Sequence, residues 1–191
     1  KRANILSGPE WLYSSILRNK QVIAVSGTHG KTSTTAMIAW IFEYLERNIG
    51  YLIAGKPNNF EVSSRLGSEE VFVIEADEYD TAFFDKRAKF IHYHPDVLVL
   101  NNIEFDHADI YSDLSQIQKQ FHHLIRTLPE DASIIFPESD KNIETLFELG
   151  CWSNKIGFSN NKDSDNYYIA LKEDFSSSQI VSGENVSNLN W

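Results

Sequence analysis

The sequence predicts an α/β fold of the doubly wound type, in which helices cover both faces of a mostly parallel sheet. Three short apolar runs, at residues 22–25, 71–74 and 97–100, are continuous rather than alternating. Such runs are typical of strands that are buried on both faces of a parallel sheet. Residues 133–136 form a fourth, shorter candidate strand.

Two segments between these runs have the spacing of amphipathic helices. Apolar residues recur at helical intervals from Ser33 to Arg47, and Asn48 and Gly50 then supply a stop signal. A second apolar set recurs from Asp113 to Leu128. The alternation of strands and helices is the pattern that favours a parallel sheet.

The character of the chain changes near its C-terminal end. Residues 167–171 and 179–181 look like short strands separated by polar, turn-forming segments. We therefore expect an ATPase core at residues 1–152. Residues 153–191 would form a small, antiparallel, β-rich extension of the same domain.

The charge of the chain limits the classes of partner. Lys and Arg number 17 and Asp and Glu number 27, so the formal net charge is −10. This balance argues against nucleic acid and against a membrane surface as partners. A single cysteine, Cys151, fits a reduced, cytoplasmic protein. The chain begins without Met, and we expect it to be part of a longer protein.

The strongest motif follows the first apolar run. It reads Gly-Thr-His-Gly-Lys-Thr-Ser and joins a predicted strand to a predicted helix. Gly27 and Gly30 allow the backbone to turn tightly and to approach an anion, so that successive N–H groups point at phosphate. Lys31 can reach the β- and γ-phosphates of a nucleotide, and the Thr32 hydroxyl can ligate Mg²⁺.

The loop differs from the general P-loop pattern at its start, where Val25 occupies the position of the first glycine. The alternative interpretation is an ordinary glycine-containing turn with an incidental Lys-Thr pair. The flanking strand and helix favour nucleotide binding. We therefore assign Thr28, His29 and Ser33 to the nucleotide site together with the two glycines, the lysine and the threonine named above.

The other two apolar runs also end in polar residues. Glu75 is the first residue after residues 71–74 and is the best candidate metal ligand, as in the second magnesium element of P-loop enzymes. Asn102 and His107 follow residues 97–100. In open α/β sheets, ligands bind at the carboxyl ends of the strands. From the spacing alone, two interpretations of His107 stay open: it binds Mg²⁺ or phosphate, or it has a structural role.

Three further acidic residues follow Glu75 within five positions. We interpret them as partners of nearby basic residues rather than as catalytic groups. The acidic residues and their expected partners are Asp77, Glu78, Asp80, Lys86, Arg87 and Lys89.

Three motifs, in this order, resemble the central domain of the Mur ligases: Gly27–Thr32, Glu75–Glu78 and Asn102–His107. The longer segment Glu75–Arg87 resembles those members of the family that join UDP-N-acetylmuramate to the tripeptide L-Ala-γ-D-Glu-meso-diaminopimelate. The resemblance extends from about residue 7 to residue 137.

This resemblance implies an ATP-dependent, ADP-forming ligase of peptidoglycan recycling that makes an amide through an acyl phosphate. It implies ATP and Mg²⁺ as cofactors and Lys31, Glu75 and His107 as catalytic residues. Thr32, Glu75 and His107 would hold the metal, and Asn102 would shape the nucleotide side of the cleft. UDP-N-acetylmuramate and the tripeptide would be bound mainly by domains outside this chain, so we expect no ligase activity from the chain alone.

Three alternatives stay open. The chain resembles, less closely, ligases that add L-alanine to UDP-N-acetylmuramate and ligases of the folylpolyglutamate synthase type, and the segment from Glu75 to Arg87 argues against both. The third alternative is a P-loop module that binds a nucleotide and switches a partner without making a bond. The acidic residues at the strand ends argue against that module.

Overall fold

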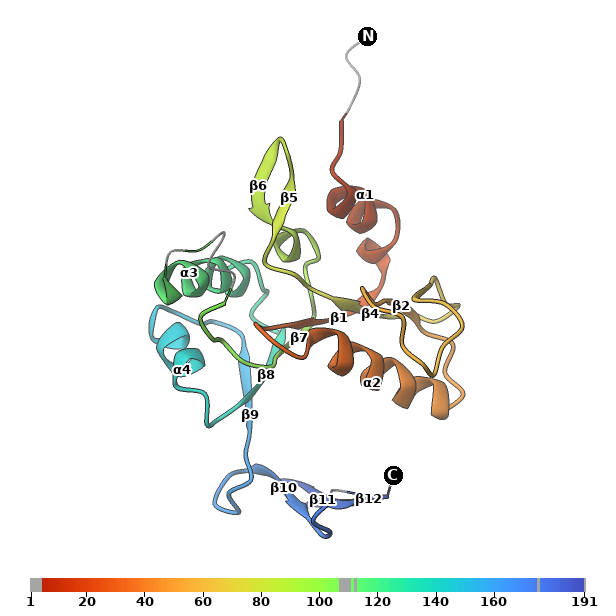
Figure 1. Cartoon of the computed structure of the whole chain (residues 1–191), viewed down its shortest axis with the longest axis vertical. Coiled ribbons are helices and arrows are strands. Elements are labelled where there is room, and N and C mark those ends of the chain that lie inside the picture. The colour runs from red at the N-terminus through yellow and green to blue at the C-terminus, as the bar shows by residue number, and fades with distance from the viewer. Residues whose placement is uncertain (1–4, 107–110, 112, 175, 191) are drawn as a thin grey trace.

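The computed structural model describes residues 5–106, 111, 113–174 and 176–190. Its main element is a seven-stranded sheet (Figure 1). In spatial order the strands are β3 (Ser64–Arg65), β2 (Gly50–Leu52), β4 (Val71–Glu75), β1 (Gln21–Ser26), β7 (Val97–Leu100), β8 (Ser133–Pro137) and β9 (Asn154–Phe158). Every neighbouring pair is parallel except β2 with β3. The prediction of a mostly parallel sheet is therefore confirmed.

The four strands predicted from apolar runs are β1, β4, β7 and β8, and they lie side by side in the sheet. Val25 of β1 is opposite Glu75 of β4, and Ser26 of β1 is opposite Leu100 of β7. Because the strands are parallel and in this register, their carboxyl ends meet at one edge of the sheet. The polar segments that follow β1, β4 and β7 are thereby brought together.

Helices cover both faces of the sheet (Figure 1). They are α1 (Gly8–Ser15), α2 (Lys31–Tyr44), α3 (Leu114–Ile125) and α4 (Lys141–Glu148), with short 3₁₀ turns η1 (Leu17–Asn19) and η2 (Lys89–His92). Ile23 and Val73 pack with α2, whereas Ala24 and Ile74 belong to the opposite core, which α1, α3 and α4 close. Adjacent residues of β1 and β4 thus enter different cores, which explains why these runs are continuously apolar.

The boundaries of α2 differ from the predicted range of 33–47. The helix begins at Lys31, because Gly30 serves as its N-cap with a φ of 79°. It ends at Tyr44, and Glu46 has a positive φ of 57° that is incompatible with a continuing helix. The early start places Lys31 and Thr32 in the first turn of the helix, directly after the glycine-rich loop.

The boundaries of α3, in contrast, fall inside the predicted range of 113–128. Asp113 is its N-cap, and the side chain accepts a hydrogen bond from the backbone N–H of Gln116 at 3.1 Å. Phe121 is fully buried on this helix, with its ring centroid 5.5 Å from that of Phe90. The apolar face of α3 is therefore fixed on the sheet, and its opposite side faces outwards.

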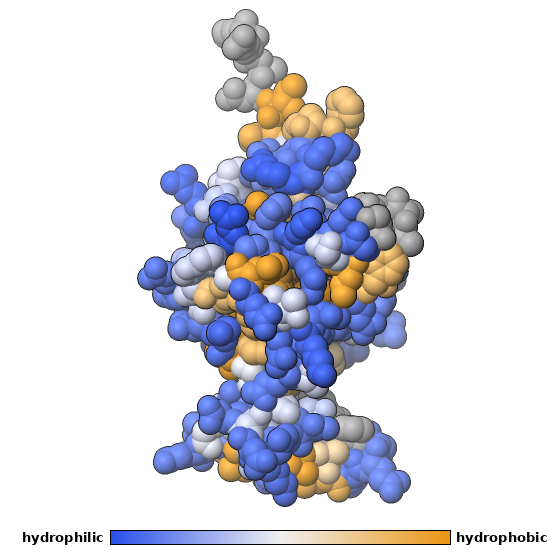
Figure 2. Space-filling model, turned by 90° about the vertical axis from the view of Figure 1, so that its left-hand side faces the viewer, coloured by the Kyte–Doolittle hydropathy of each residue, from blue (hydrophilic) through white to orange (hydrophobic). Residues whose placement is uncertain are grey.

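The C-terminal strands form a separate three-stranded antiparallel sheet of β10 (Asn166–Ala170), β11 (Ser177–Ser182) and β12 (Asn185–Asn190). Figure 2 shows this end of the chain as a lobe below the main body. The expected small antiparallel appendage is confirmed. Strand β9, which falls within residues 153–191, pairs with β8 and completes the large sheet instead.

A two-stranded hairpin of β5 (Asp80–Ala82) and β6 (Asp85–Ala88) projects from the same side of the sheet as α1 (Figure 1). It follows β4 directly and leads into η2, so it is anchored at both ends close to the carboxyl edge of the sheet. Across the described ranges of the chain, none of the helices has the length and apolar character needed to cross a membrane.

Candidate functional site

The glycine-rich loop between β1 and α2 is packed directly on the segment that follows β7. Gly27 has a φ of 134°, and a Cβ atom placed on it would lie 2.9 Å from the backbone oxygen of Asn102. Gly30 has a φ of 79°, and its Cβ would lie 3.1 Å from Nδ2 of Asn101. Both positions therefore require glycine, for backbone conformation and for space.

Two consecutive asparagines hold this loop in place. The backbone N–H of His29 donates to Oδ1 of Asn102 at 2.8 Å, and the backbone N–H of Thr28 donates to the carbonyl of Asn102 at 3.0 Å. Asn101 donates through Nδ2 to the carbonyl of His29 and to the hydroxyl of Thr34. The structure thus places Asn102 against the loop, and it adds Asn101, which sequence reasoning missed.

Lys31 is buried at the start of α2. Its Nζ donates to the carbonyl of Gly27 at 2.8 Å and to Oε2 of Glu78 at 3.2 Å, and it lies 3.9 Å from a carboxylate oxygen of Asp77. The backbone oxygen of Glu78 also accepts a hydrogen bond from the buried hydroxyl of Tyr111. Burial raises the pKa of Tyr111 to about 12.

The expectation that Asp77 and Glu78 pair with basic residues further along the chain is wrong. Both acidic residues turn towards Lys31, because they follow β4 at the edge of the sheet where α2 begins. Asp80 does pair with Lys86, at 2.7 Å, as expected. Glu78 is the site residue that the sequence interpretation missed, and its position three residues after a strand end was the available signal.

Thr32 and Glu75 form the second contact between α2 and β4. The Thr32 hydroxyl donates to Oε1 of Glu75 at 2.8 Å, and the backbone N–H of Ala54 donates to Oε2 at 2.9 Å. Two oxygen atoms that could ligate a metal, one from α2 and one from β4, thus lie within hydrogen-bond distance of each other. Hydroxyl and carboxylate oxygens are the ligands that Mg²⁺ prefers, so this pair fits the metal implied by the sequence resemblance.

The remaining predicted residues lie around this centre. Ser33 is exposed in the first turn of α2, and Thr28 is buried, where its hydroxyl accepts from the backbone N–H of Glu104 at 2.9 Å. His29 is exposed, with Nδ1 3.8 Å from Oδ2 of Asp106. His107 lies outside the described residues, and its role as a metal ligand stays a prediction.

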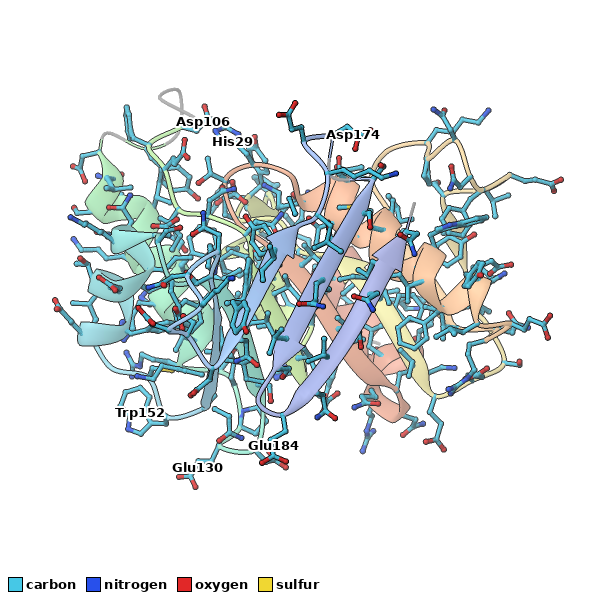
Figure 3. All side chains as sticks on the ribbon, turned by 90° about the horizontal axis from the view of Figure 1, so that it is seen from below. His29, Asp106, Glu130, Trp152, Asp174 and Glu184 are labelled. Atoms are coloured by element: carbon cyan, nitrogen blue, oxygen red, sulfur yellow. The ribbon has the colours of Figure 1, made fainter. Side chains whose placement is uncertain are left out.

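Figure 3 shows the location of this site relative to the sheet. His29 and Asp106 lie together at one edge, whereas Glu130 and Trp152, which precede β8 and β9, lie at the opposite edge. The loop and the acidic residues are therefore at the carboxyl ends of the strands, the edge at which ligands bind in open α/β sheets.

Two hollows adjoin the loop. One, of about 550 Å³, lies beyond β7 and β8 and is lined by residues that include Asn101, Asn102 and Asp140. The other, of about 460 Å³, lies beside Thr32 and is lined by apolar side chains that include Trp40. The first is bordered by the same two asparagines that hold the loop, so it adjoins the loop directly.

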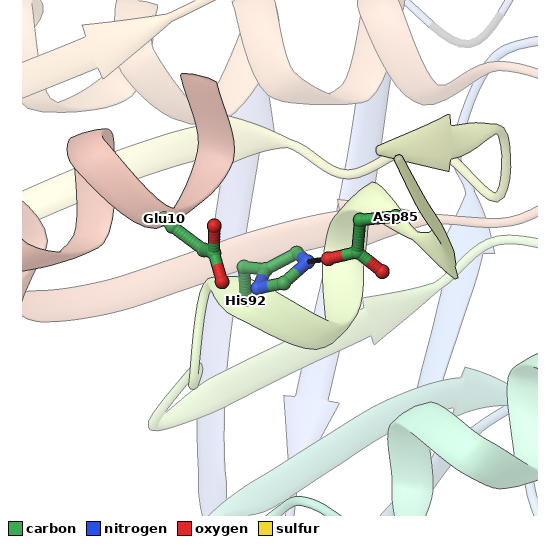
Figure 4. Close-up of side chains that lie close together, drawn as sticks. All are labelled: Glu10, Asp85 and His92. Carbon is green, nitrogen blue, oxygen red and sulfur yellow. Dashed lines mark ion pairs between the residues drawn. The ribbon is translucent and has the colours of Figure 1, made fainter. Parts of the chain in front are cut away.

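A second cluster of titratable side chains joins α1 to the β5–β6 hairpin. Figure 4 shows Glu10, Asp85 and His92, whose potential ligand atoms all lie within 4.8 Å of one another. Arg87 already engages Asp85 through two hydrogen bonds, which hold the pKa of that carboxyl well below its usual range. Ser7 donates to Glu10 and closes a capping box. These contacts connect α1 to the β5–β6 hairpin and η2.

The family of this chain follows from its match to a known domain. A model described as the Mur ligase middle domain matches residues 25–189. The chain belongs to the Mur ligase family. The matched range contains the glycine-rich loop, the acidic ends of β4 and β7, and the three-stranded sheet.

Two Mur ligases illustrate how close the similarity is. A UDP-N-acetylmuramate--L-alanyl-gamma-D-glutamyl-meso-2,6-diaminoheptandioate ligase from Escherichia coli K12 is 48% identical over 196 residues, which cover 100% of this chain and 42% of that protein. The crystal structure of the corresponding ligase from Neisseria meningitides superimposes with a TM-score of 0.87 at 42% identity, over 97% of this chain and 60% of that chain. This chain thus spans about two fifths of the curated relative.

Mur ligases with another acceptor are more distant. A UDP-N-acetylmuramate--L-alanine ligase from Rubrobacter xylanophilus is 35% identical over 134 residues, which cover 70% of this chain and 28% of that protein. The similarity to the tripeptide-type ligase is thus both higher and more extensive.

The buried His92 predicts a pH dependence of stability. Burial is the main cause that lowers the pKa of His92 below its ordinary value of 6.5. As the pH falls below that value, the unfolded chain takes up the proton first, so the folded state loses stability. We expect His92→Asn to reduce the loss of unfolding free energy between about pH 7.5 and about pH 5.5, measured by urea denaturation.

The matched control is His123→Asn, which changes an exposed histidine on α3. This control should lose as much stability over the same pH interval as the wild type. An unchanged pH dependence in His92→Asn would contradict the assignment.

Proposed function

We propose that the full-length protein is a cytoplasmic, ATP-dependent ligase that joins UDP-N-acetylmuramate to the tripeptide L-Ala-γ-D-Glu-meso-diaminopimelate in peptidoglycan recycling. In this proposal the chain supplies the ATP and Mg²⁺ site. The observation that carries it is the contact of Lys31 and Thr32 with the acidic residues Glu78 and Glu75 at one end of a glycine-rich loop. The 48% sequence identity to a ligase of this type supports the proposed choice of substrates.

The proposed reaction needs the positioning of phosphate more than a protein nucleophile. The γ-phosphate of ATP passes to the lactyl carboxylate of UDP-N-acetylmuramate, and ADP leaves. The amine of the tripeptide attacks the resulting acyl phosphate, and the tetrahedral intermediate collapses to the amide and inorganic phosphate. Lys31 and the N-terminus of α2 would hold the transferring phosphate and stabilise the charge that develops on it.

Thr32 and Glu75 would hold the magnesium ion, and His107 is the third proposed ligand. When bound, the metal would neutralise phosphate charge and stabilise the transition state by an amount on the order of several kcal/mol. Lys31 would exchange its contact with Glu78 for one with phosphate, because a cation at this position has a stronger partner once the nucleotide is present.

The nucleoside is proposed to lie in the hollow beyond β7 and β8. This hollow of about 550 Å³ is lined by Asn101 and Asn102, which also contact the loop, and by Asp140. Asn102 would then position both the loop and the nucleotide. Its replacement would weaken ATP binding without removing a group that reacts.

The proposed acceptor is the tripeptide rather than L-alanine. One ligase that adds L-alanine is 35% identical over 70% of this chain. One ligase that adds the tripeptide is 48% identical over the whole chain. The segment from Glu75 to Arg87, which carries the sequence resemblance to the tripeptide type, builds the β5–β6 hairpin. This hairpin stands beside the proposed phosphate site, where it can contact an acceptor.

Substitutions in the full-length enzyme test the site. Lys31→Ala should abolish turnover, because it removes the proposed phosphate contact. Glu75→Ala should raise the Mg²⁺ concentration needed for half-maximal rate by at least about tenfold, because a charged ligand is lost. Steady-state phosphate release at varied Mg²⁺ measures both effects. Asp163→Ala, in an exposed loop of the C-terminal segment, is the control and should behave like wild type.

The acceptor is tested by phosphate release from the full-length enzyme with UDP-N-acetylmuramate and Mg·ATP. We expect turnover with the tripeptide and little with L-alanine. A preference for L-alanine would leave the ATP site intact but would contradict the proposed substrate and the role in recycling.

A further inference from the structure

Three side chains that take no part in the proposed ATP site meet between three elements. Glu10 lies on α1, Asp85 on β6 and His92 on η2. Figure 4 shows them together, and one potential ligand atom of each lies within 4.8 Å of those of the other two. These elements are distant from one another in the sequence, so it is the fold that brings a histidine and two carboxylates to one place.

His92 provides the observation that points to a ligand. The residue is only 6% exposed, and its Nε2 atom is buried without a hydrogen-bond partner among the described residues. Nε2 faces Oδ2 of Asp85 at 3.1 Å, which is an ion pair only when the imidazole is protonated. Burial lowers the pKa of His92 and so favours the neutral ring, which is the form of histidine that ligates metals. A buried nitrogen without a partner destabilises the fold, and a bound cation would satisfy it.

Both carboxylates retain the capacity to bind a cation. In Glu10, Oε2 accepts two hydrogen bonds from Ser7, and Oε1 lies 3.5 Å from Nη2 of Arg87. In Asp85, Oδ1 accepts from the backbone and the side chain of Arg87, and Oδ2 lies between Arg87 and His92. Because an ionised carboxylate has about four acceptor sites, one oxygen of each residue can still face a metal.

Arg87 is the cation that pairs with these carboxylates in the structure. Two carboxylates and one guanidinium sum to a charge of −1 around His92, which a divalent ion would complement. The side chain of Arg87 is 58% exposed, whereas that of Asp85 is 11% exposed. Arg87 can therefore turn towards solvent when a metal enters, while Asp85 and His92 stay in place.

The mixture of ligands indicates the class of metal. Imidazole nitrogen together with carboxylate oxygen suits Zn²⁺, whereas Mg²⁺ and Ca²⁺ favour sites built from oxygen alone. Three protein ligands leave a position for water, and Glu10 is partly exposed, so the site is open on its side.

We propose that Glu10, Asp85 and His92 form a Zn²⁺ site, with one ligand from each of α1, β6 and η2. The ion would fasten α1 and η2 to the β5–β6 hairpin, the segment that carries the resemblance to the tripeptide-type ligases. The site uses none of the residues proposed to bind ATP or Mg²⁺, so the inference does not depend on the proposed function.

The test is a calorimetric titration of the full-length protein with Zn²⁺ in excess Mg²⁺, which competes at sites built from oxygen alone. The wild type should bind one ion in this cluster. Glu10→Gln, Asp85→Asn and His92→Asn should each weaken binding by at least about 100-fold, since loss of an outer-shell partner alone costs about tenfold to about 100-fold.

Two features of the design separate loss of a ligand from loss of the fold. Glu10→Gln keeps the capping box with Ser7, because glutamine also serves at that position of a helix. Glu130→Gln and His123→Asn make the same chemical changes at exposed positions before β8 and on α3. Both control variants should bind Zn²⁺ like the wild type.

Arg87→Met should change the affinity in the opposite direction. It removes a positive charge beside the ion, so Zn²⁺ should bind about tenfold more tightly than to the wild type. A second readout is thermal unfolding, since an ion that binds only the folded state stabilises it. Zn²⁺ should raise the unfolding midpoint of the wild type and of Arg87→Met, but not that of Glu10→Gln.

Two outcomes would overturn the inference. If the wild type binds no Zn²⁺ in excess Mg²⁺, the cluster is not a zinc site. If Zn²⁺ binds equally well to the wild type, Glu10→Gln and His92→Asn, the ion lies elsewhere in the protein. Neither readout measures ligase activity, so failure here would leave the proposed function to its own tests.

Discussion

The close packing of Gly27 on the segment after β7 is the constraint on which the rest of the site depends. A Cβ atom at Gly27 would lie 2.9 Å from the backbone oxygen of Asn102, and the φ of 134° excludes most other residues. The loop therefore packs against its neighbour, where the backbone N–H groups of Thr28 and His29 donate to Asn102. Because α2 begins immediately afterwards, Lys31 and Thr32 are delivered to the acidic end of β4.

The contacts between α2 and β4 link the fold to the proposed chemistry. Lys31 is buried, and a buried cation destabilises a protein unless it is paired and hydrogen-bonded. Glu78 and the carbonyl of Gly27 satisfy it, while Glu75 satisfies Thr32. The same groups that stabilise the junction are those proposed to bind phosphate and metal, so they are already close together before a nucleotide arrives, and Lys31 would then exchange Glu78 for phosphate.

The sequence predicts the centre of the sheet well because β1, β4, β7 and β8 are continuous apolar runs. It does not predict α4, which has only eight residues and too few helical turns for a clear periodicity, or β9, whose side chains are mostly exposed. The loop can be identified from the sequence alone, because its glycine, lysine and threonine residues lie together in one short motif.

The partners of the loop could not be identified in the same way. Glu78 and Lys31 are 47 positions apart, and only the parallel register of β1 and β4 brings them together. Asn101 bonds to Thr34, which is 67 positions away, so this contact depends on the three-dimensional arrangement and is not evident in the sequence. Local sequence thus indicates which groups can react, whereas the sheet register determines which of them meet.

The most direct test of this account is the binding of Mg·ADP to the full-length protein, measured by titration calorimetry for the wild type, Gly27→Ala and Gly183→Ala. Gly183 also has a positive φ, of 56°, but it lies in the β11–β12 turn with open space around it. We expect Gly27→Ala to weaken binding by about 100-fold or more, because the loop can no longer lie on Asn102, and Gly183→Ala to bind like the wild type. Wild-type affinity in a folded Gly27→Ala protein would contradict the central claim.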